Sequence, residues 1–434
     1  MCLKKQSVEA SQDLISDAEF KNRHRKSVKV FVRTRKLPFG RLIVLILQKG
    51  LKSLQLRINE LTSLLGGETL TNSALTQARA NLKHTAFIEL NRKAVVDVMY
   101  GDDDYKRYKD MRVLGIDGSK ILLPSTPDII NAFGQISYSN DQDGVEGQHA
   151  YGLASALYDV LNHVAVDSFL GKAKDYEVNL AIQHLDGTRE NDLLICDRNY
   201  PSYYFLSYLS KIKRHFVIRC SASSFQEARD MLTGEGAESR LTMIACPPQK
   251  RALIQSQALP ESITVRFVRV QLETGEYEVL VTSLLDDSVF PTTDFLGLYH
   301  LRWGVEGFYG ILKTRLHLEN FSGKTAESIY QDFYSTVYLS GLESILTADT
   351  NERLSQKMTQ HPQQVNHAVS FNAIKNQAFN LLLSNQPSET VIAGLEKFFL
   401  TNPVSKRVDR KVPRQKRSAR HLINFLKRNI KICF

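Results

Sequence analysis

Residues 299–313 have the sequence YHLRWGVEGFYGILK, the most informative stretch of the chain. Four polar residues in it follow one another at spacings of 3, 4 and 7, namely Tyr299, Arg302, Glu306 and Lys313. At about 100° per residue of an α-helix, these spacings put all four side chains within about 60° of one face. A helix that only packs against a core carries apolar groups on such a face. One carboxylate, two cations and a phenol are instead typical of a face that holds a metal ion beside a phosphate.

Two aspartates follow apolar runs that are typical of buried strands. Asp117 ends the run RVLGID, and Asp197 ends the run LLICD. Side chains at strand ends of an α/β sheet project into the crevice where ligands bind. Two such carboxylates can hold a pair of Mg²⁺ ions about 4 Å apart, with Glu306 completing one site. Either aspartate alone is weak evidence, because Asp is abundant in turns and Asp117-Gly118 is a turn dipeptide.

The order of strands and helices predicted between residues 112 and 220 indicates an α/β core of ribonuclease-H type. Three β-like runs come first, and then a helix, the LLIC strand, a second helix and the strand His215–Cys220. Residues 221–294 carry further β-like segments, one of them Ala252–Gln255, and are interpreted as an all-β insertion. Helix is expected again from Phe295 to about residue 400.

These elements divide the chain into five predicted regions. The regions are a helical DNA-binding region (1–105), the first part of a ribonuclease-H-like catalytic core (106–220), the β-strand insertion (221–294), the second part of the core with Glu306 (295–375), and a helical, basic C-terminal segment (376–434). The insertion would explain why Glu306 comes so long after Asp197 in the sequence.

The N-terminal region combines helical patterns with a run of positive charge. Lys21 to Arg41 contains nine Lys and Arg and no acid, and it leads into a helix with apolar positions from Leu42 to Leu61. Gly66-Gly67 breaks that pattern, and Thr71 is typical of a helix start because its side chain can cap free N–H groups. The next helix is expected to expose Arg79. Two such helices resemble a helix-turn-helix, although most helical hairpins bind nothing.

Positive charge is concentrated at the two ends of the chain. The net charge is +10, residues 1–60 hold 14 Lys and Arg against 5 Asp and Glu, and residues 406–434 hold 11 against 1. Basic ends suit a polyanion, and the acidic middle of the chain suits a site that collects carboxylates. The alternative is that both ends are only solvated tails. The cations expected to contact a DNA backbone are Arg407, Arg410, Lys411, Arg414, Lys416, Arg417 and Arg420.

Composition argues against several other classes of protein. No apolar run reaches the roughly 18 residues that a membrane span needs, and the N-terminus lacks the pattern of a secretion signal. No two of the five cysteines form a Cys-x-x-Cys pair, which argues against a disulfide framework or a structural zinc site. We therefore expect a protein of a reducing cytoplasm and not of a membrane.

The stretch at 299–313 resembles the Y-R-E-K signature of DDE transposases of bacterial insertion sequences, in the IS-four branch. The resemblance extends to IDGSKILLPSTPD around Asp117, to CDRNY around Asp197, and to the segments ENFSGKT (319–325) and RTRKLPF (33–39). It covers about residues 30–345. One departure is Asn199, where the family usually has Gly; Asn tolerates a positive φ, so a turn would survive there.

This resemblance implies a role for each residue of the pattern. Asp117, Asp197 and Glu306 would be the catalytic triad and would bind Mg²⁺, with Mn²⁺ as a substitute. Tyr299, Arg302 and Lys313 would bind DNA by gripping phosphates at the transposon end. The chemistry of the side chains agrees, since Arg offers a bidentate fork to phosphate, Lys a point charge and Tyr a neutral donor.

The function that follows is DNA transposition by metal-dependent strand cleavage and strand transfer. The family's cut-and-paste reaction implies hairpin ends, terminal inverted repeats and target DNA as double-stranded DNA partners, and a homodimer in the synaptic complex. One alternative is a ribonuclease-H-like nuclease without strand transfer, which would have no reason for the phosphate-gripping residues. Another is a catalytically inactive, transposase-derived DNA-binding protein, against which the intact acids argue.

Two features of the signature stretch are not explained by this function. Trp303, the only tryptophan, is expected to pack in a core. Gly304, Gly307 and Gly310 each cost about 1 kcal/mol relative to Ala in a helix. They either permit close approach of DNA or a neighbouring strand, or are merely tolerated.

Overall fold

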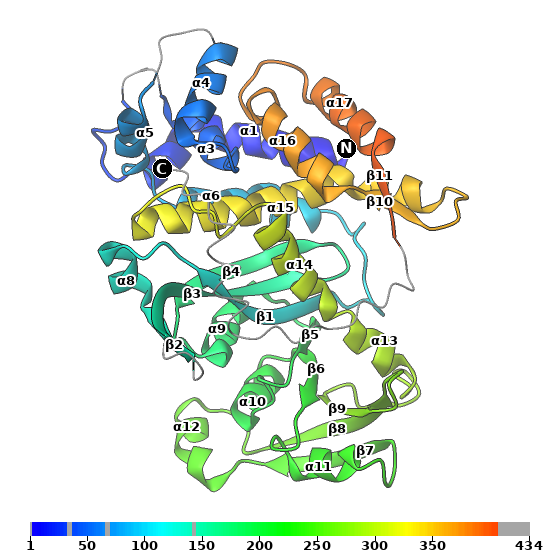
Figure 1. Ribbon diagram of the computed structural model, residues 1–434. Helices are drawn as coiled ribbons and strands as arrows, with labels where there is room; N and C mark the ends of the chain where they lie inside the picture. Colours follow the sequence, from blue (N-terminus) through cyan, green and yellow to red (C-terminus); the bar gives the residue numbers. More distant parts are fainter. Residues whose placement is uncertain (1, 33–36, 66–69, 141–144, 407–434) are drawn as a thin grey trace. The chain divides into compact units, whose positions relative to one another are not determined.

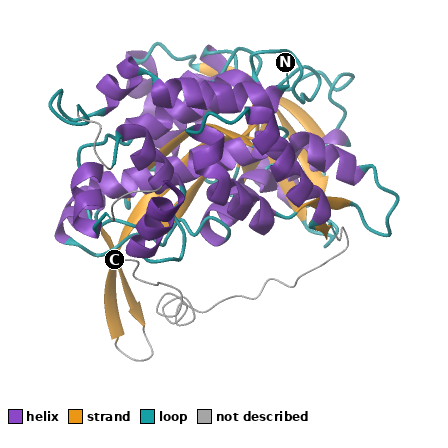
Figure 2. Cartoon of the chain, turned by 90° about the horizontal axis from the view of Figure 1, so that it is seen from above, coloured by secondary structure: helices purple, strands orange, loops and turns teal. Residues whose placement is uncertain are grey.

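A computed structural model describes residues 2–32, 37–65, 70–140 and 145–406 of the chain (Figure 1). The chain forms two compact units, each made of segments that are distant in sequence. The first unit comprises Met1–Asp104, Lys120–Gly152 and Gly310–Phe434. The second unit comprises Tyr105–Ser119 and Leu153–Tyr309. Helices and strands are both well represented, so the fold is mixed α/β as expected (Figure 2).

The first unit is mainly helical. Its helices are α1 (Leu3–Ser16), α2 (Ala18–His24), α3 (Phe39–Leu47), α4 (Leu54–Leu65), α5 (Asn72–Arg79), α6 (Thr85–Leu90), a π-helical segment (Asn91–Val96), α7 (Asp97–Met99), α8 (Pro127–Phe133), α15 (Ala326–Ser355), α16 (His367–Leu382) and α17 (Ser388–Thr401). The long helix α15 packs against α3, α6 and α17. It begins at a capping box, in which Thr325 and Ser328 each bond the other's backbone N–H. The short strands β10 (Gln363–Val365) and β11 (Pro403–Ser405) pair with each other.

The largest sheet of the described chain has nine strands. Its order is β2-β3-β1-β5-β6-β9-β8-β7, with β4 pairing with β3 off this path. The strands are β1 (Val113–Leu122), β2 (Gln135–Asn140), β3 (Val145–Asp159), β4 (Val164–Lys172), β5 (Leu193–Cys196), β6 (His215–Cys220), β7 (Ser239–Ala245), β8 (Ser262–Gln271) and β9 (Tyr277–Thr282). The β1, β5 and β6 strands are parallel neighbours, whereas β9, β8 and β7 continue the sheet antiparallel. All of β5 is buried, which explains its uninterrupted apolar sequence.

The helices of the second unit flank these strands in sequence. They are α9 (Glu177–His184), a 3₁₀ turn (Leu185–Gly187), α10 (Tyr203–Lys211), α11 (Gln226–Leu232), a 3₁₀ turn (Pro248–Lys250), α12 (Arg251–Ser256) and α13 (Asp294–His300). The helix α14 (Trp303–Thr314) begins in this unit and ends in the first. None of the helices in the described ranges is long and apolar enough to cross a membrane.

Several sequence predictions about secondary structure are confirmed. Two of the three β-like runs expected before the first helix are the paired strands β3 and β4, and the LLIC run is the strand β5. Thr71 caps α5, where its side chain accepts a hydrogen bond from the Ala74 N–H at 3.2 Å. The predicted breaker Gly66-Gly67 lies outside the described residues, as do most of the basic C-terminal segment and part of the RTRKLPF motif.

Other predictions are wrong. The helix expected over residues 42–61 is two helices, because α3 ends at Leu47 and α4 begins at Leu54. Residues 221–294 are not all-β, since they include α11 and α12, and Ala252–Gln255 is helical. A short apolar run does not distinguish a strand from a buried helix by its periodicity. The strands of this region also extend the sheet directly, because β9 pairs with β6.

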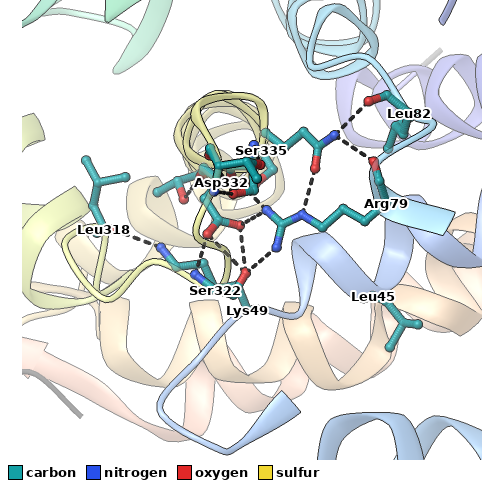
Figure 3. Close-up of polar contacts among 12 residues, drawn as sticks. Leu45, Lys49, Arg79, Leu82, Leu318, Ser322, Asp332 and Ser335 are labelled. Atoms are coloured by element: carbon teal, nitrogen blue, oxygen red, sulfur yellow. Dashed lines mark hydrogen bonds and ion pairs between the residues drawn. The ribbon is translucent and has the colours of Figure 1, made fainter. Parts of the chain in front are cut away.

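Arg79, expected to be exposed, is buried in the core of the first unit (Figure 3). Its guanidinium donates to Asp332 at 2.7 Å and to the Ser322 hydroxyl at 2.7 Å, and Gln331 accepts a further bond at 2.6 Å. The Ser322 N–H and hydroxyl also donate to the Asp332 carboxylate. Burial opposes ionisation of Asp332, but Arg79 and then Lys49 keep its pKa below the usual value. This arginine therefore has a structural role and is not available to bind DNA.

Candidate active site

The register of two parallel strands brings Asp117 and Asp197 to neighbouring positions. In this register Ile116 of β1 lies opposite Cys196 of β5, and each is followed by one of the two aspartates. Asp197 comes directly after its strand, as the sequence predicted. Asp117 does not end its strand, because β1 continues to Leu122. The acid was expected at a strand end because it closes the apolar run RVLGID, but the strand continues through the turn dipeptide Asp117-Gly118.

The signature stretch is not one continuous helix. The α13 helix ends at His300 and α14 begins at Trp303. Tight i to i−3 hydrogen bonds join them, including Arg302 N to Tyr299 O at 3.0 Å and Val305 N to Arg302 O at 3.1 Å. The prediction that all four polar residues share one helical face is therefore wrong. Tyr299 lies on α13, Arg302 in the turn, and Glu306 with Lys313 on α14.

Close backbone packing sets α14 against the sheet of the second unit. A Cβ built at Gly115 of β1 would lie 3.4 Å from the Val305 Cβ and 3.2 Å from the Val160 side chain. A Cβ built at Gly304 would lie 3.2 Å from the Cβ of Val160. Only small residues fit at such approaches. Gly304 is thus explained by packing against the residue that follows β3, whereas a Cβ at Gly307 would meet no described atom within 4 Å.

Arg302, between α13 and α14, contacts side chains of both helices. Its side chain is buried, with 3% of the residue exposed, and its Nη1 donates to Oε1 of Glu306 at 2.7 Å. Its guanidinium lies 5.5 Å from the ring centroid of Tyr299 and 4.8 Å from that of Trp303. Trp303 is 47% exposed, so the expectation of a core tryptophan is wrong. The indole instead covers one side of the arginine.

Tyr299 is buried and turned toward the second aspartate. Its hydroxyl donates to Oδ1 of Asp197 at 3.4 Å. Burial, followed by the charge of Asp197, raises the pKa of the phenol, although Arg302 opposes this. At neutral pH the phenol is therefore a neutral donor that orients Asp197.

Asp117 has the most strongly perturbed carboxyl of the site. Burial, followed by the charges of Glu306 and Glu177, raises its pKa to about 6, while the Gly118 N–H and Arg302 act in the opposite direction. Tyr309 of α14 is also buried, and its hydroxyl donates to the Asp117 carbonyl at 3.1 Å. Several carboxylates therefore share one partly desolvated region, which is typical of functional sites.

Lys313 belongs to the first unit, and its contacts lie there. Its Nζ donates to the Lys120 carbonyl at 2.7 Å and lies 3.8 Å from Oε1 of Glu319. Burial lowers the pKa of Lys313, and Glu319 opposes that shift. The other five residues predicted from the sequence lie together in the second unit.

The donor set fits a hard divalent cation in its chemistry. Carboxylate oxygens are the ligands that Mg²⁺ prefers. Burial, and then the charges of Glu306 and Glu177, raise the pKa of Asp117, and a bound cation would oppose both effects. Within the described ranges, however, no group of three or more His, Cys, Asp or Glu side chains is arranged to coordinate a metal ion. Arg302 occupies one carboxylate oxygen of Glu306. The residues that would hold an ion are therefore Asp117, Asp197 and Glu306, with Glu306 paired to arginine in this structure.

Two contributors to the site were missed in the sequence. Glu177, at the start of α9, acts on Asp117 through its charge, and Asn199 donates from Nδ2 to Oε2 of Glu177 at 3.3 Å. The sequence indicated only that Asn199 tolerates a positive φ, but its backbone does not adopt one. No local sequence signal marks Glu177, because its partners are distant in the chain.

Comparison with known proteins identifies the family of this chain through a family model. The family model described as Transposase DDE domain matches residues 108–338. The chain is 24% identical over 318 residues to "Transposase InsG for insertion sequence element IS4" of Escherichia coli (strain K12), covering 71% of this chain and 69% of that protein. It is also similar to a chain of the piggyBac transposase synaptic complex with hairpin DNA, with a TM-score of 0.43, 10% identity, and coverage of 94% of this chain and 88% of that one. The resemblance drawn from the motifs is confirmed by the family match, which spans more than half of the sequence. The chain belongs to the transposase DDE domain family.

Proposed function

We propose that this chain cuts and joins DNA at the ends of an insertion sequence, with Asp117, Asp197 and Glu306 as its catalytic, metal-binding triad. Membership of the family makes it a DNA transposase of the DDE class. The observation that carries the assignment of residues is the register of β1 and β5, which brings both aspartates to neighbouring positions. Glu306 is connected to them electrostatically through Arg302.

The residues around the triad support this chemistry. Bound divalent ions, Mg²⁺ or Mn²⁺, would activate the attacking water or 3′-hydroxyl and stabilise the leaving 3′-oxygen. Tyr299 orients Asp197, and Tyr309 fixes the backbone at Asp117. Asp117 must be ionised to bind a cation, so its raised pKa favours activity above about pH 6.

Arg302 is the proposed contact to a DNA phosphate in this unit. Its Nη1 is bonded to Glu306, but its Nε has no hydrogen-bond partner in the part of the chain that the structure describes. A buried guanidinium with an unused donor suits a phosphate oxygen, which arginine can bind in a bidentate manner. Lys313 would add a point charge to DNA bound at the first unit, and Tyr299 would act mainly through Asp197.

The remaining parts of the proposal rest on the family resemblance. They are a ribonuclease-H-like core that residues 221–294 interrupt, an N-terminal region that binds terminal inverted repeats, hairpin formation at the cut ends, and a homodimer that bridges two ends. The parallel order β1-β5-β6 and the preceding antiparallel strands are consistent with such a core.

The test is cleavage of the element's own ends by the full chain. Duplexes carrying the terminal repeats that flank the gene are incubated with the protein and Mg²⁺ or Mn²⁺, and nicks, hairpins and joined products are resolved on denaturing gels. We expect Asp117→Asn, Asp197→Asn and Glu306→Gln each to abolish cleavage while leaving end binding. Glu190→Gln, which removes an exposed acid of the same unit, is the control.

The outcomes separate the alternatives. Nicking without hairpins or joined products would indicate a nuclease without strand transfer. Binding of the ends without any cleavage would indicate an inactive DNA-binding protein. Normal cleavage by one of the three variants would remove that residue from the triad.

A further inference from the structure

Glu177 packs against Gly118, the residue that follows Asp117, because residue 118 has no side chain. It is the first residue of α9, in the second unit. A Cβ built at Gly118 would lie 2.9 Å from Oε1 of Glu177 and 3.1 Å from its carboxyl carbon. The carboxylate therefore rests on the backbone of the residue that follows Asp117.

The other oxygen of Glu177 faces the loop that follows Asp197. Oε2 accepts a hydrogen bond from Nδ2 of Asn199 at 3.3 Å. Asn199 stands where the resembled family usually has glycine, which could not make this bond. One carboxylate thus contacts both segments that carry the two aspartates, and a side-chain donor holds it there.

Tyr200, which follows Asn199 in the same loop, carries a buried hydroxyl. Tyr200 has 0% of its surface exposed, and its hydroxyl has no hydrogen-bond partner among the described residues. Burial raises the pKa of this phenol first, and the charges that raise it further include those of Glu177 and Asp117. Buried polar atoms without partners are uncommon in folded proteins. This hydroxyl is a donor that a bound group, such as a water on a cation, would satisfy.

We infer that Glu177 is a fourth carboxylate of the site and holds a divalent cation together with Asp117, directly or through a water that bonds to Tyr200. The inference rests on the proposed function, because it concerns the same cation. The competing explanation is purely structural, since an acid at a helix N-terminus also stabilises the helix. The two explanations differ in what they predict for cation affinity.

The experiment measures Mn²⁺ binding to the full chain in the absence of DNA, by titration calorimetry and by the electron paramagnetic resonance signal of free Mn²⁺. We expect Glu177→Gln to weaken binding by about tenfold or more, the size typical of residues that support metal ligands. Glu177→Asp should recover part of the affinity, and Glu190→Gln should match the wild type. Thermal unfolding in EDTA, with no loss of stability in Glu177→Gln, would separate this loss from a loss of folding.

A second variant moves Glu177 without changing any acid. In Gly118→Ala the new Cβ would displace the flexible end of Glu177, so Mn²⁺ affinity should fall. In the double variant with Glu177→Gln it should fall no further, because no carboxylate remains to be displaced. Additive losses would show that Gly118 acts independently of Glu177, against the inference.

The outcomes distinguish this inference from the proposed function. If Asp117→Asn loses Mn²⁺ binding and cleavage while Glu177→Gln retains wild-type affinity, the triad stands and the fourth carboxylate is overturned. If the wild type binds no Mn²⁺ and the triad variants cleave normally, both proposals fail. A tenfold rise in the Mg²⁺ concentration that half-saturates cleavage by Glu177→Gln, with calorimetry in agreement, supports the inference.

Discussion

At the scale of single residues, the site is governed by the cost of keeping several carboxylates close together in a partly buried region. Arg302 offsets part of this free-energy cost. It bonds Glu306, and its positive charge opposes the net rise in the pKa of Asp117. The part of the cost that Arg302 does not offset is seen in the pKa of Asp117, which stays raised. Burial is the largest cause of this rise. In this unit, folding without a bound cation is therefore opposed by the charge of Asp117.

The first prediction concerns the pH dependence of stability. The pKa of Asp117 in the folded chain, about 6, lies above its usual value of 3.8, so the folded state binds the proton more tightly. Stability from this group is fully present below about pH 4 and is lost as pH rises through about 6. Asp117→Asn should therefore raise the free energy of unfolding at pH 8 in EDTA, by at most about 3 kcal/mol.

Urea unfolding of both proteins at pH 4 and pH 8 checks this prediction. The difference between Asp117→Asn and the wild type should be larger at pH 8. An equal difference at both pH values would mean that Asp117 is not perturbed in the folded chain.

At the scale of elements, the turn between α13 and α14 and the close approach of α14 to β1 determine where Glu306 lies. Gly115 and Gly304 permit this approach, since either Cβ would meet Val160 at 3.2 Å. Gly307 has open space around it instead. The two glycines of α14 should therefore respond differently to the same substitution.

The second prediction compares Gly304→Ala with Gly307→Ala. Gly304→Ala should destabilise the chain by about 1–3 kcal/mol, because the added methyl overpacks against Val160. Gly307→Ala should stabilise it by about 0.4–1 kcal/mol, because alanine restricts the unfolded chain. Urea unfolding measures both, and destabilisation by Gly307→Ala would contradict the open space. If Gly307→Ala is stable but cleaves poorly, DNA approaches the helix at that position.

The third prediction concerns the connection between α5 and α15 within the first unit. Arg79→Ala would leave Asp332 buried without its main partner and should destabilise the chain by about 3–5 kcal/mol. The control is Lys52→Ala, which removes an exposed ion pair with Glu60 and should cost about 1 kcal/mol or less. Denaturant unfolding measures both, and equal small effects would show that the buried network is dispensable.

At the scale of the whole molecule, positive charge at both ends of the sequence accompanies a net negative middle. Lysine and arginine near DNA release condensed counterions, so binding that depends on them weakens steeply with salt. Arg79 does not contribute to this surface charge, because it is buried in an ion pair.

The fourth prediction is that a chain ending at Lys406 binds duplex DNA more weakly and with a smaller salt dependence. Each phosphate contact that is lost should reduce the slope of log K against log salt by about 0.9. Fluorescence anisotropy at several salt concentrations measures the slope, and the Asp117→Asn variant of the full chain is the control that keeps the C-terminal segment. An unchanged slope would indicate that this segment is only a solvated tail.

The sequence by itself determined several local elements and the residue types of the candidate site. The four apolar residues LLIC predicted a buried strand, Thr71 predicted a helix start, and the spacing from Tyr299 to Lys313 indicated the family. These signals are local, since they depend on propensity, capping and periodicity within a few residues.

Only the tertiary structure decided which of these residues meet. Periodicity predicted one helix through Arg302, but the chain turns at this residue between α13 and α14. Val305 of α14 packs on Gly115, and Arg302 forms a buried ion pair with Glu306. Likewise, the contact of Glu177 with Gly118 and the burial of Arg79 depend on strand register and helix packing between distant segments. A sequence pattern predicts which residues of a helix or strand are buried. Packing between distant segments decides which other residues cover them.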